Sequence, residues 1–261
     1  MTDSTLPPPE EEQLEEATLI SHLIELRQRL MWGFGAVLAV FLCLAPFAER
    51  VFAIVAQPLM AQLPDTSTMI ATQVASPFLV PFKTTLFVAL FIAMPVVLYQ
   101  LWAFVAPGLY RKEKRFAIPL LLSSIVLFYL GIGFAYFVVF PLMFAFFNAV
   151  APEGVAVMTD IGSYLDFILV IFMAFGIAFE VPIATVMLVA TGLTTTDSLK
   201  SKRPYVFLGA FVMGMLLTPP DVISQTLLAI PVYLLFEAGI IMARVMLPDH
   251  EPTETAGDET A

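Results

Sequence analysis

The sequence contains few of the side chains that enzymes use for metal and thiol chemistry. Its 261 residues include one cysteine, Cys43, and two histidines, His22 and His250. A single cysteine excludes an intrachain disulfide and a cluster of thiolate ligands. Both histidines lie outside the apolar runs, so we expect no metal and no other cofactor. No pair of His, Cys or Asp residues has catalytic spacing within one apolar run, which argues against a membrane-embedded enzyme.

Charged residues are also scarce. They make up 13% of the chain, whereas 59% of the residues are hydrophobic, and the mean hydropathy is +0.90. Soluble domains are typically about 45–50% apolar and about 25% charged. The composition therefore predicts an all-α integral membrane protein.

The net charge of −10 comes from the two ends of the chain. Eleven of the 22 acidic residues lie in residues 1–20 and 246–261, which contain no Lys or Arg, so the body carries 12 basic and 11 acidic residues. The low hydrophobicity of both ends predicts disordered, solvated tails around a membrane domain of residues 21–245. An acidic chain of this kind argues against a nucleic-acid partner.

Six apolar runs are candidates for membrane spans, which need roughly 20 apolar residues each. They cover residues 30–47, 79–105, 116–147, 164–190, 205–217 and 222–245. The pair Pro219-Pro220 separates the last two runs. We predict six transmembrane helices, the last two of them short.

The basic residues indicate an orientation. With a cytoplasmic N-terminus and six spans, ten of the 12 basic residues fall on the cytoplasmic side, and Arg50 and Lys83 fall on the other. This distribution follows the positive-inside rule and predicts that both termini are cytoplasmic.

Two carboxylates are predicted on the cytoplasmic face. Glu25 lies in the amphipathic segment S-H-L-I-E-L-R-Q-R-L, four residues before Arg29, and Glu113 lies in the loop R-K-E-K-R. Together they could bind paired guanidinium groups through bidentate hydrogen bonds. An interfacial helix and an ordinary positive-inside loop would explain the same residues.

Glu180 is the 17th residue of its 27-residue run. A charge at such a depth costs about 2.5–3.5 kcal/mol on insertion scales, so the residue is a functional candidate. It could carry protons in a proton-coupled secondary transporter, or be a neutral acid bonded to a neighbouring helix. Internal repeats, which are common in such transporters, are not found. Asp221 follows Pro220 and is expected to cap the last helix.

Seven motifs carry a family resemblance. They are H-L-I-E-L-R-Q-R-L, I-A-T-Q-V-A-S-P-F, Y-Q-L-W-A-F-V-A-P-G-L-Y, F-A-Y-F-V-V-F-P-L, A-F-G-I-A-F-E-V-P-I-A, K-R-P-Y and T-P-P-D-V-I-S-Q-T-L-L-A-I-P. In this order, between Ser21 and Arg244, they resemble TatC, the multispan subunit of the twin-arginine (Sec-independent) protein translocase.

The resemblance implies a cup-shaped protein of the bacterial cytoplasmic (inner) membrane that catalyses no reaction. It would bind twin-arginine signal peptides of folded cargo at its cytoplasmic face. TatA- and TatB-type single-span proteins, further copies of the chain and membrane lipid would be its partners. The proton-motive force would drive export.

The resemblance also implies roles for particular residues. Glu25 and Glu113 would contact the twin arginines, and Arg27 and Phe104 would shape that surface. Glu180 would be an intramembrane acid on the concave face. Partner docking would use Met215, Thr218 and Gln225, and Pro58 would shape the outer loop.

Overall fold

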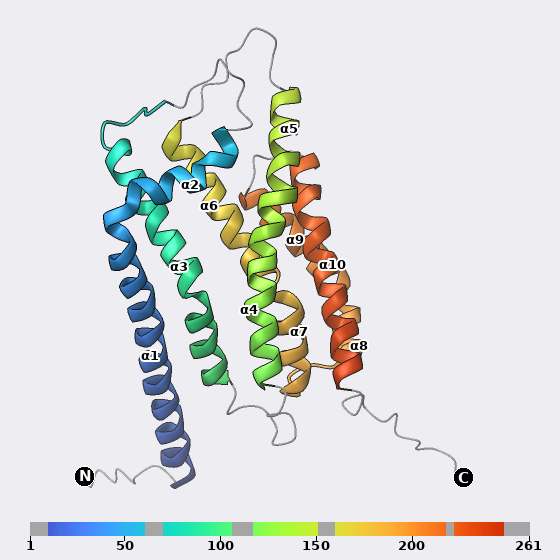
Figure 1. Ribbon diagram of the computed structural model, residues 1–261. Coiled ribbons are helices and arrows are strands. Elements are labelled where there is room, and N and C mark those ends of the chain that lie inside the picture. Colours follow the sequence, from blue (N-terminus) through green and yellow to red (C-terminus); the bar gives the residue numbers. More distant parts are fainter. Residues whose placement is uncertain (1–9, 61–69, 106–116, 151–159, 218–221, 248–261) are drawn as a thin grey trace, which may run out of the picture.

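The computed structural model describes residues 10–60, 70–105, 117–150, 160–217 and 222–247 as a bundle of helices that run back and forth (Figure 1). Within these ranges the extended structure amounts to one isolated bridge, between Ile70 and Asp160. The helices are α1 (Glu10–Leu44), α2 (Ala48–Met60), α3 (Ser76–Val105), α4 (Ala117–Phe134), α5 (Phe140–Val150), α6 (Ile161–Ala178), α7 (Val181–Ala190), α8 (Thr196–Ser201), α9 (Arg203–Leu217) and α10 (Val222–Met246).

Five helical passages are long and apolar enough to cross a membrane, with lengths of 22 to 37 residues. The helix α9 has 15 residues and reaches about 22 Å, less than the hydrocarbon core of about 30 Å. The prediction of a short helix is thus confirmed for α9. It is wrong for α10, which has 25 residues: the predicted run 222–245 is itself long enough to span, and the helix continues through Pro231. Apolar helices tolerate such a proline when neighbouring groups satisfy the freed carbonyl.

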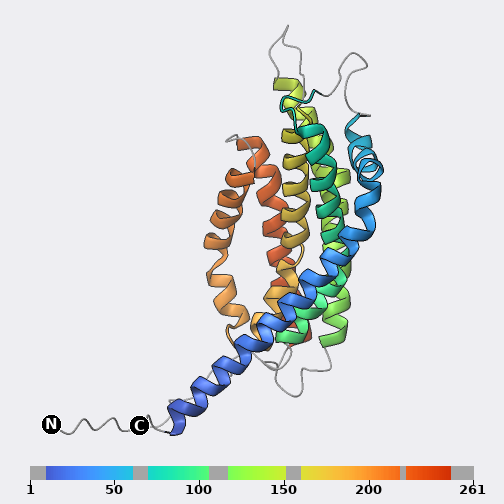
Figure 2. The same cartoon turned by 90° about the vertical axis from the view of Figure 1, so that its left-hand side faces the viewer.

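The first helix is longer than the apolar run that it contains. It begins at Glu10, directly after Pro9, and so covers residues 10–20 of the predicted tail. These residues include five Glu, two Leu and one Ala, which favour helix, and no Gly or Pro. Figure 2 shows that the start of α1 projects beyond the ends of the other helices. Most of its described side chains are exposed, as is typical of a helix that faces lipid.

Two of the long passages are interrupted. A π-helical segment, Ala135–Val139, joins α4 to α5. The fourth passage breaks between α6 and α7, at Phe179 and Glu180. Pro182 explains this break because it has no N–H to donate to the carbonyl of Ala178.

Glycines allow the helices to approach closely at two crossings. A Cβ added at Gly131 of α4 would lie 2.5 Å from the carbonyl oxygen of Phe175 of α6. One added at Gly239 of α10 would lie 2.9 Å from Cα of Pro182 and from Thr185, both in α7. Small residues at crossings are typical of helices that associate by van der Waals packing in membranes. These contacts fix α6 and α7, and therefore the position of Glu180 between them.

Candidate functional site

The first candidate site lies where the middle of α1 meets the last two turns of α3. Arg29 donates a hydrogen bond to Glu25 at 3.1 Å and another to Oε1 of Gln100 at 3.4 Å. The ring of His22 stacks on Phe104, with a centroid distance of 4.2 Å. We call these five residues the α1–α3 polar cluster.

The cluster is open to a ligand. The side chains of Glu25 and Arg29 are 36% and 31% exposed, and the pair is four residues apart on one helix face. An exposed pair of this kind contributes only about 0.3–0.5 kcal/mol to stability. Arg29 therefore holds the Glu25 carboxylate in place, but the pair is weak enough for another cation to replace Arg29.

Two of the four predicted recognition residues meet in this cluster, namely Glu25 and Phe104. Arg27 is exposed, but it lies two residues from Glu25 and therefore on the opposite side of α1. Glu113 lies outside the described residues. The contributions of His22, Arg29 and Gln100 were not predicted, because a contact between α1 and α3 cannot be read from either helix alone.

The second candidate site surrounds Glu180. Trp102 of α3 donates its indole N–H to Oγ of Ser124 of α4 at 3.3 Å, and Ser124 donates to Oε2 of Glu180 at 2.5 Å. Ser124 and Trp102 are 1% and 7% exposed. The other carboxyl oxygen of Glu180, Oε1, is buried and has no hydrogen-bond partner among the described residues.

The prediction for Glu180 needs one correction. It was placed in the middle of a continuous span, whereas the structure places it at the break before α7, with its backbone N–H bonded to the carbonyl of Ile177 at 3.0 Å. Ser124 and Trp102 were missed. The signal that could have found Ser124 is the pair Ser123-Ser124, which interrupts an apolar run.

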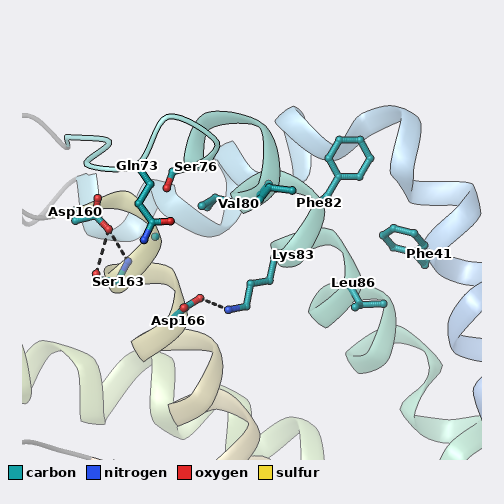
Figure 3. A pocket seen from close by; sticks show the side chains of 12 residues that line it. Phe41, Gln73, Ser76, Val80, Phe82, Lys83, Leu86, Asp160, Ser163 and Asp166 are labelled. Atoms are coloured by element: carbon teal, nitrogen blue, oxygen red, sulfur yellow. Dashed lines mark hydrogen bonds and ion pairs between the residues drawn. The ribbon is translucent and has the colours of Figure 1, made fainter.

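A third polar site lies at the end of the bundle where α3 and α6 begin (Figure 3). Lys83 of α3 donates to Asp166 of α6 at 2.6 Å. Asp160 caps α6 by accepting from the backbone N–H of Ser163 at 2.9 Å, and it also accepts from the backbone N–H and hydroxyl of Thr72 at 2.9 and 2.7 Å. These bonds, with that of Ser163 first, lower the pKa of Asp160. Asp166 lies inside a predicted span and was overlooked.

Two of the three predicted partner-docking residues, Met215 and Gln225, lie where α9 and α10 meet. Met215 is 52% exposed on α9. A Cβ added at the adjacent Gly214 would lie 3.3 Å from the carbonyl oxygen of Gln225, so these two helices are close here. Thr218 and Asp221 lie outside the described residues. Pro58 lies within α2, and its side chain is outside the described part of the chain.

The opposite ends of α9 and α10 are joined by an ion pair. Arg203 donates to Glu237 at 2.6 Å, with side chains 44% and 22% exposed. Nearby, Asp197 of α8 pairs with Lys200 at 2.6 Å, which lowers the pKa of Asp197. Across the described residues, no three His, Cys, Asp or Glu side chains lie close enough to hold a metal ion.

A bundle of long apolar helices with a buried carboxylate and polar clusters at both ends defines a multispan integral membrane protein. The family model of the Sec-independent protein translocase protein (TatC) matches residues 21–231. The chain belongs to this family, a component of the twin-arginine translocase, and its general role is protein transport. The family resemblance of the seven motifs is confirmed.

Individual relatives are similar to this chain over most of their length. The TatC proteins of Azotobacter chroococcum mcd 1 and Escherichia coli K12 are 57% and 59% identical to this chain, over 93% and 87% of it and 95% and 88% of the relatives. A solved structure described as the twin-arginine translocase receptor TatC superposes with a TM-score of 0.76 at 40% identity. It covers 86% of this chain and 98% of that one.

Proposed function

We propose that this chain is the receptor subunit of the twin-arginine translocase and binds the arginine pair of signal peptides at the α1–α3 polar cluster. The observation that carries the proposal is the half-exposed carboxylate of Glu25, which already binds a guanidinium group, that of Arg29. An incoming arginine can replace Arg29 without leaving the carboxylate unpaired. Because Arg29 also bonds Gln100, it keeps a partner after displacement.

A second carboxylate would complete the site. The family resemblance supports Glu113 as the partner of the second arginine, and the stacked rings of His22 and Phe104 offer a flat surface beside the first. Hydrogen bonds to charged groups contribute about 1.5–3 kcal/mol each. Two such contacts would make an arginine pair bind more tightly than a lysine pair, because lysine cannot bind a carboxylate bidentately.

Six spans, a cupped shape and cytoplasmic termini in the bacterial inner membrane are part of the proposal. Two features support the orientation. First, α1 begins and α10 ends at the same end of the bundle (Figure 1). Second, Lys200, Arg203 and Arg244 belong to that end, as the positive-inside rule requires of a cytoplasmic face.

Single-span TatA- and TatB-type partners would dock at α9 and α10, near Met215 and Gln225, with the proton-motive force driving export.

Binding of a twin-arginine peptide tests the receptor function. We expect Glu25→Ala to raise the Kd of such a peptide about tenfold or more, and Glu25→Ala with Glu113→Ala to abolish crosslinking to the peptide. Peptide fluorescence anisotropy and photocrosslinking with the purified chain provide the measurements. Glu49→Ala removes an exposed acid of α2, at the other end of the bundle, and serves as the matched control. Unchanged binding in the double variant would refute the site.

A further inference from the structure

A pocket of about 540 Å³ opens at the end of the bundle opposite to Glu25, and its lining includes none of the residues proposed above for peptide recognition or partner docking. Figure 3 shows that α3, α6 and the residues just before each of them supply its polar side chains, while Phe41 of α1 borders it on the other side. Its polar lining consists of Gln73, Ser76, Lys83, Asp160, Ser163 and Asp166, and its apolar lining includes Phe41, Leu79, Phe82 and Leu86.

The pocket presents one positive and two negative side chains to a ligand. Lys83 and Asp166 bond each other at 2.6 Å, yet their side chains are 50% and 52% exposed. The ammonium group of Lys83 has three N–H donors, and one of them donates to Oδ1 of Asp166. Asp160 keeps its charge because Thr72 and Ser163 donate hydrogen bonds to it. Lys83 therefore keeps N–H donors that a ligand could use.

The ion pair lies near the starts of two helices that are long and apolar enough to cross a membrane. Lys83 is the eighth residue of α3 and Asp166 the sixth of α6, which places them about 8–11 Å inside the helix starts. Ionisable residues within spans are costly and are usually retained for a purpose. A half-exposed ion pair stabilises a fold by no more than about 1 kcal/mol, so stability alone does not explain the pair.

We propose that this pocket binds a zwitterionic phospholipid whose headgroup ends in a primary ammonium. The phosphate accepts from Lys83, and the ammonium donates to Asp166. An acyl chain lies along the apolar wall, against Phe41, Phe82 and Leu86. A headgroup with a net negative charge fits less well, because two carboxylates face one amine. A quaternary ammonium also fits less well, because it has no N–H to donate to Asp166.

Native mass spectrometry of the delipidated full chain tests the proposal. The protein is mixed with equal amounts of phosphatidylethanolamine, phosphatidylcholine and phosphatidylglycerol that carry the same acyl chains. We expect phosphatidylethanolamine to be retained at least threefold more than either of the others. Equal retention of all three lipids would overturn the proposal.

Substitutions locate the binding to this pocket. Lys83→Met and Asp166→Asn should each remove the preference, and Leu86→Trp, which fills the pocket without touching the charges, should remove retention itself. Arg203→Met and Glu237→Gln alter an ion pair of the same length at the other end of the bundle and should change nothing. If the preference survives in Lys83→Met and Asp166→Asn, or disappears equally in the control pair, the lipid binds elsewhere and the assignment is wrong. Unchanged retention in Leu86→Trp would also contradict it, and this variant covers the case in which the charge variants fail to fold.

Discussion

Ser124 is the residue on which the buried network depends. Its hydroxyl accepts from Trp102 and donates its one proton to Glu180, so it links α3, α4 and the break between α6 and α7. Its side chain is nearly inaccessible to solvent. Since the other oxygen of Glu180 is already without a partner among the described residues, removal of this hydroxyl would leave the whole carboxyl group unsatisfied.

We therefore expect Ser124→Ala to destabilise the protein by about 1–3 kcal/mol, the usual cost of an unsatisfied buried polar group. Thermal unfolding in detergent measures the loss. Ser123→Ala is the matched control, because this adjacent serine is only partly buried and forms no such link with the described residues. Equal losses in the two variants would show that Ser124 does not hold the network.

Substitutions of Glu180 test whether this residue is a polar anchor, which only accepts a hydrogen bond, or a proton carrier. The amide oxygen of Glu180→Gln can still accept from Ser124, so an anchor should support export at near the original rate. Glu180→Ala removes the acceptor and should reduce export severalfold. A proton carrier would fail in both variants, because neither side chain titrates. Export of a folded twin-arginine reporter into the periplasm provides the measurement.

At the scale of helices, the crossing of α4 and α6 has a glycine on each side, Gly131 of α4 against Phe175 and Gly176 of α6 against Phe128. The Cβ of Gly131→Ala would meet the backbone oxygen of Phe175 at 2.5 Å, so the two helices must move apart. We expect a loss of about 1–3 kcal/mol, as for other overpacked sites. Gly133→Ala on the same helix meets nothing within 4 Å and should be neutral or slightly stabilising. The ratio of folded to aggregated protein after mild heating distinguishes the two variants. Equal ratios for Gly131→Ala and Gly133→Ala would contradict the close packing at Gly131.

The sequence predicts helices better than it predicts their breaks and contacts. Long apolar runs locate the spans because hydropathy is a property of each residue, and the short α9 follows from the run between Lys202 and Pro219. The break at Glu180 could have been inferred from Pro182, but proline in an apolar helix often causes a kink alone. Partners such as Ser124 depend on how helices cross, and crossing depends on glycines such as Gly131 together with distant backbone. Periodicity within one segment contains no such information.

At the scale of the whole molecule, the last two turns of α3 connect the α1–α3 polar cluster with the site around Glu180. Gln100 and Phe104 lie on the face that meets α1, and Trp102, two residues from each, points to the opposite side and bonds Ser124. A ligand that displaces Arg29 from Glu25 therefore acts on the same helical turn that holds the network of Glu180. A change at the recognition end of the bundle can therefore act on the buried network of Glu180 through α3.

The topology of the molecule depends on whether the short helix α9 crosses the membrane, and three cysteine variants decide this. Cys43 is exposed and is first replaced by alanine. Glu49→Cys in α2, Lys202→Cys before α9 and Val222→Cys at the start of α10 all lie at exposed positions. In cells with a permeabilised outer membrane, we expect an impermeant maleimide to label Glu49→Cys and Val222→Cys, and Lys202→Cys only after lysis. Because α9 reaches about 22 Å, crossing requires local thinning of the bilayer or snorkelling of its flanking residues. If Val222→Cys is labelled only after lysis, like Lys202→Cys, α9 does not cross, and the six-span topology with both termini in the cytoplasm is wrong.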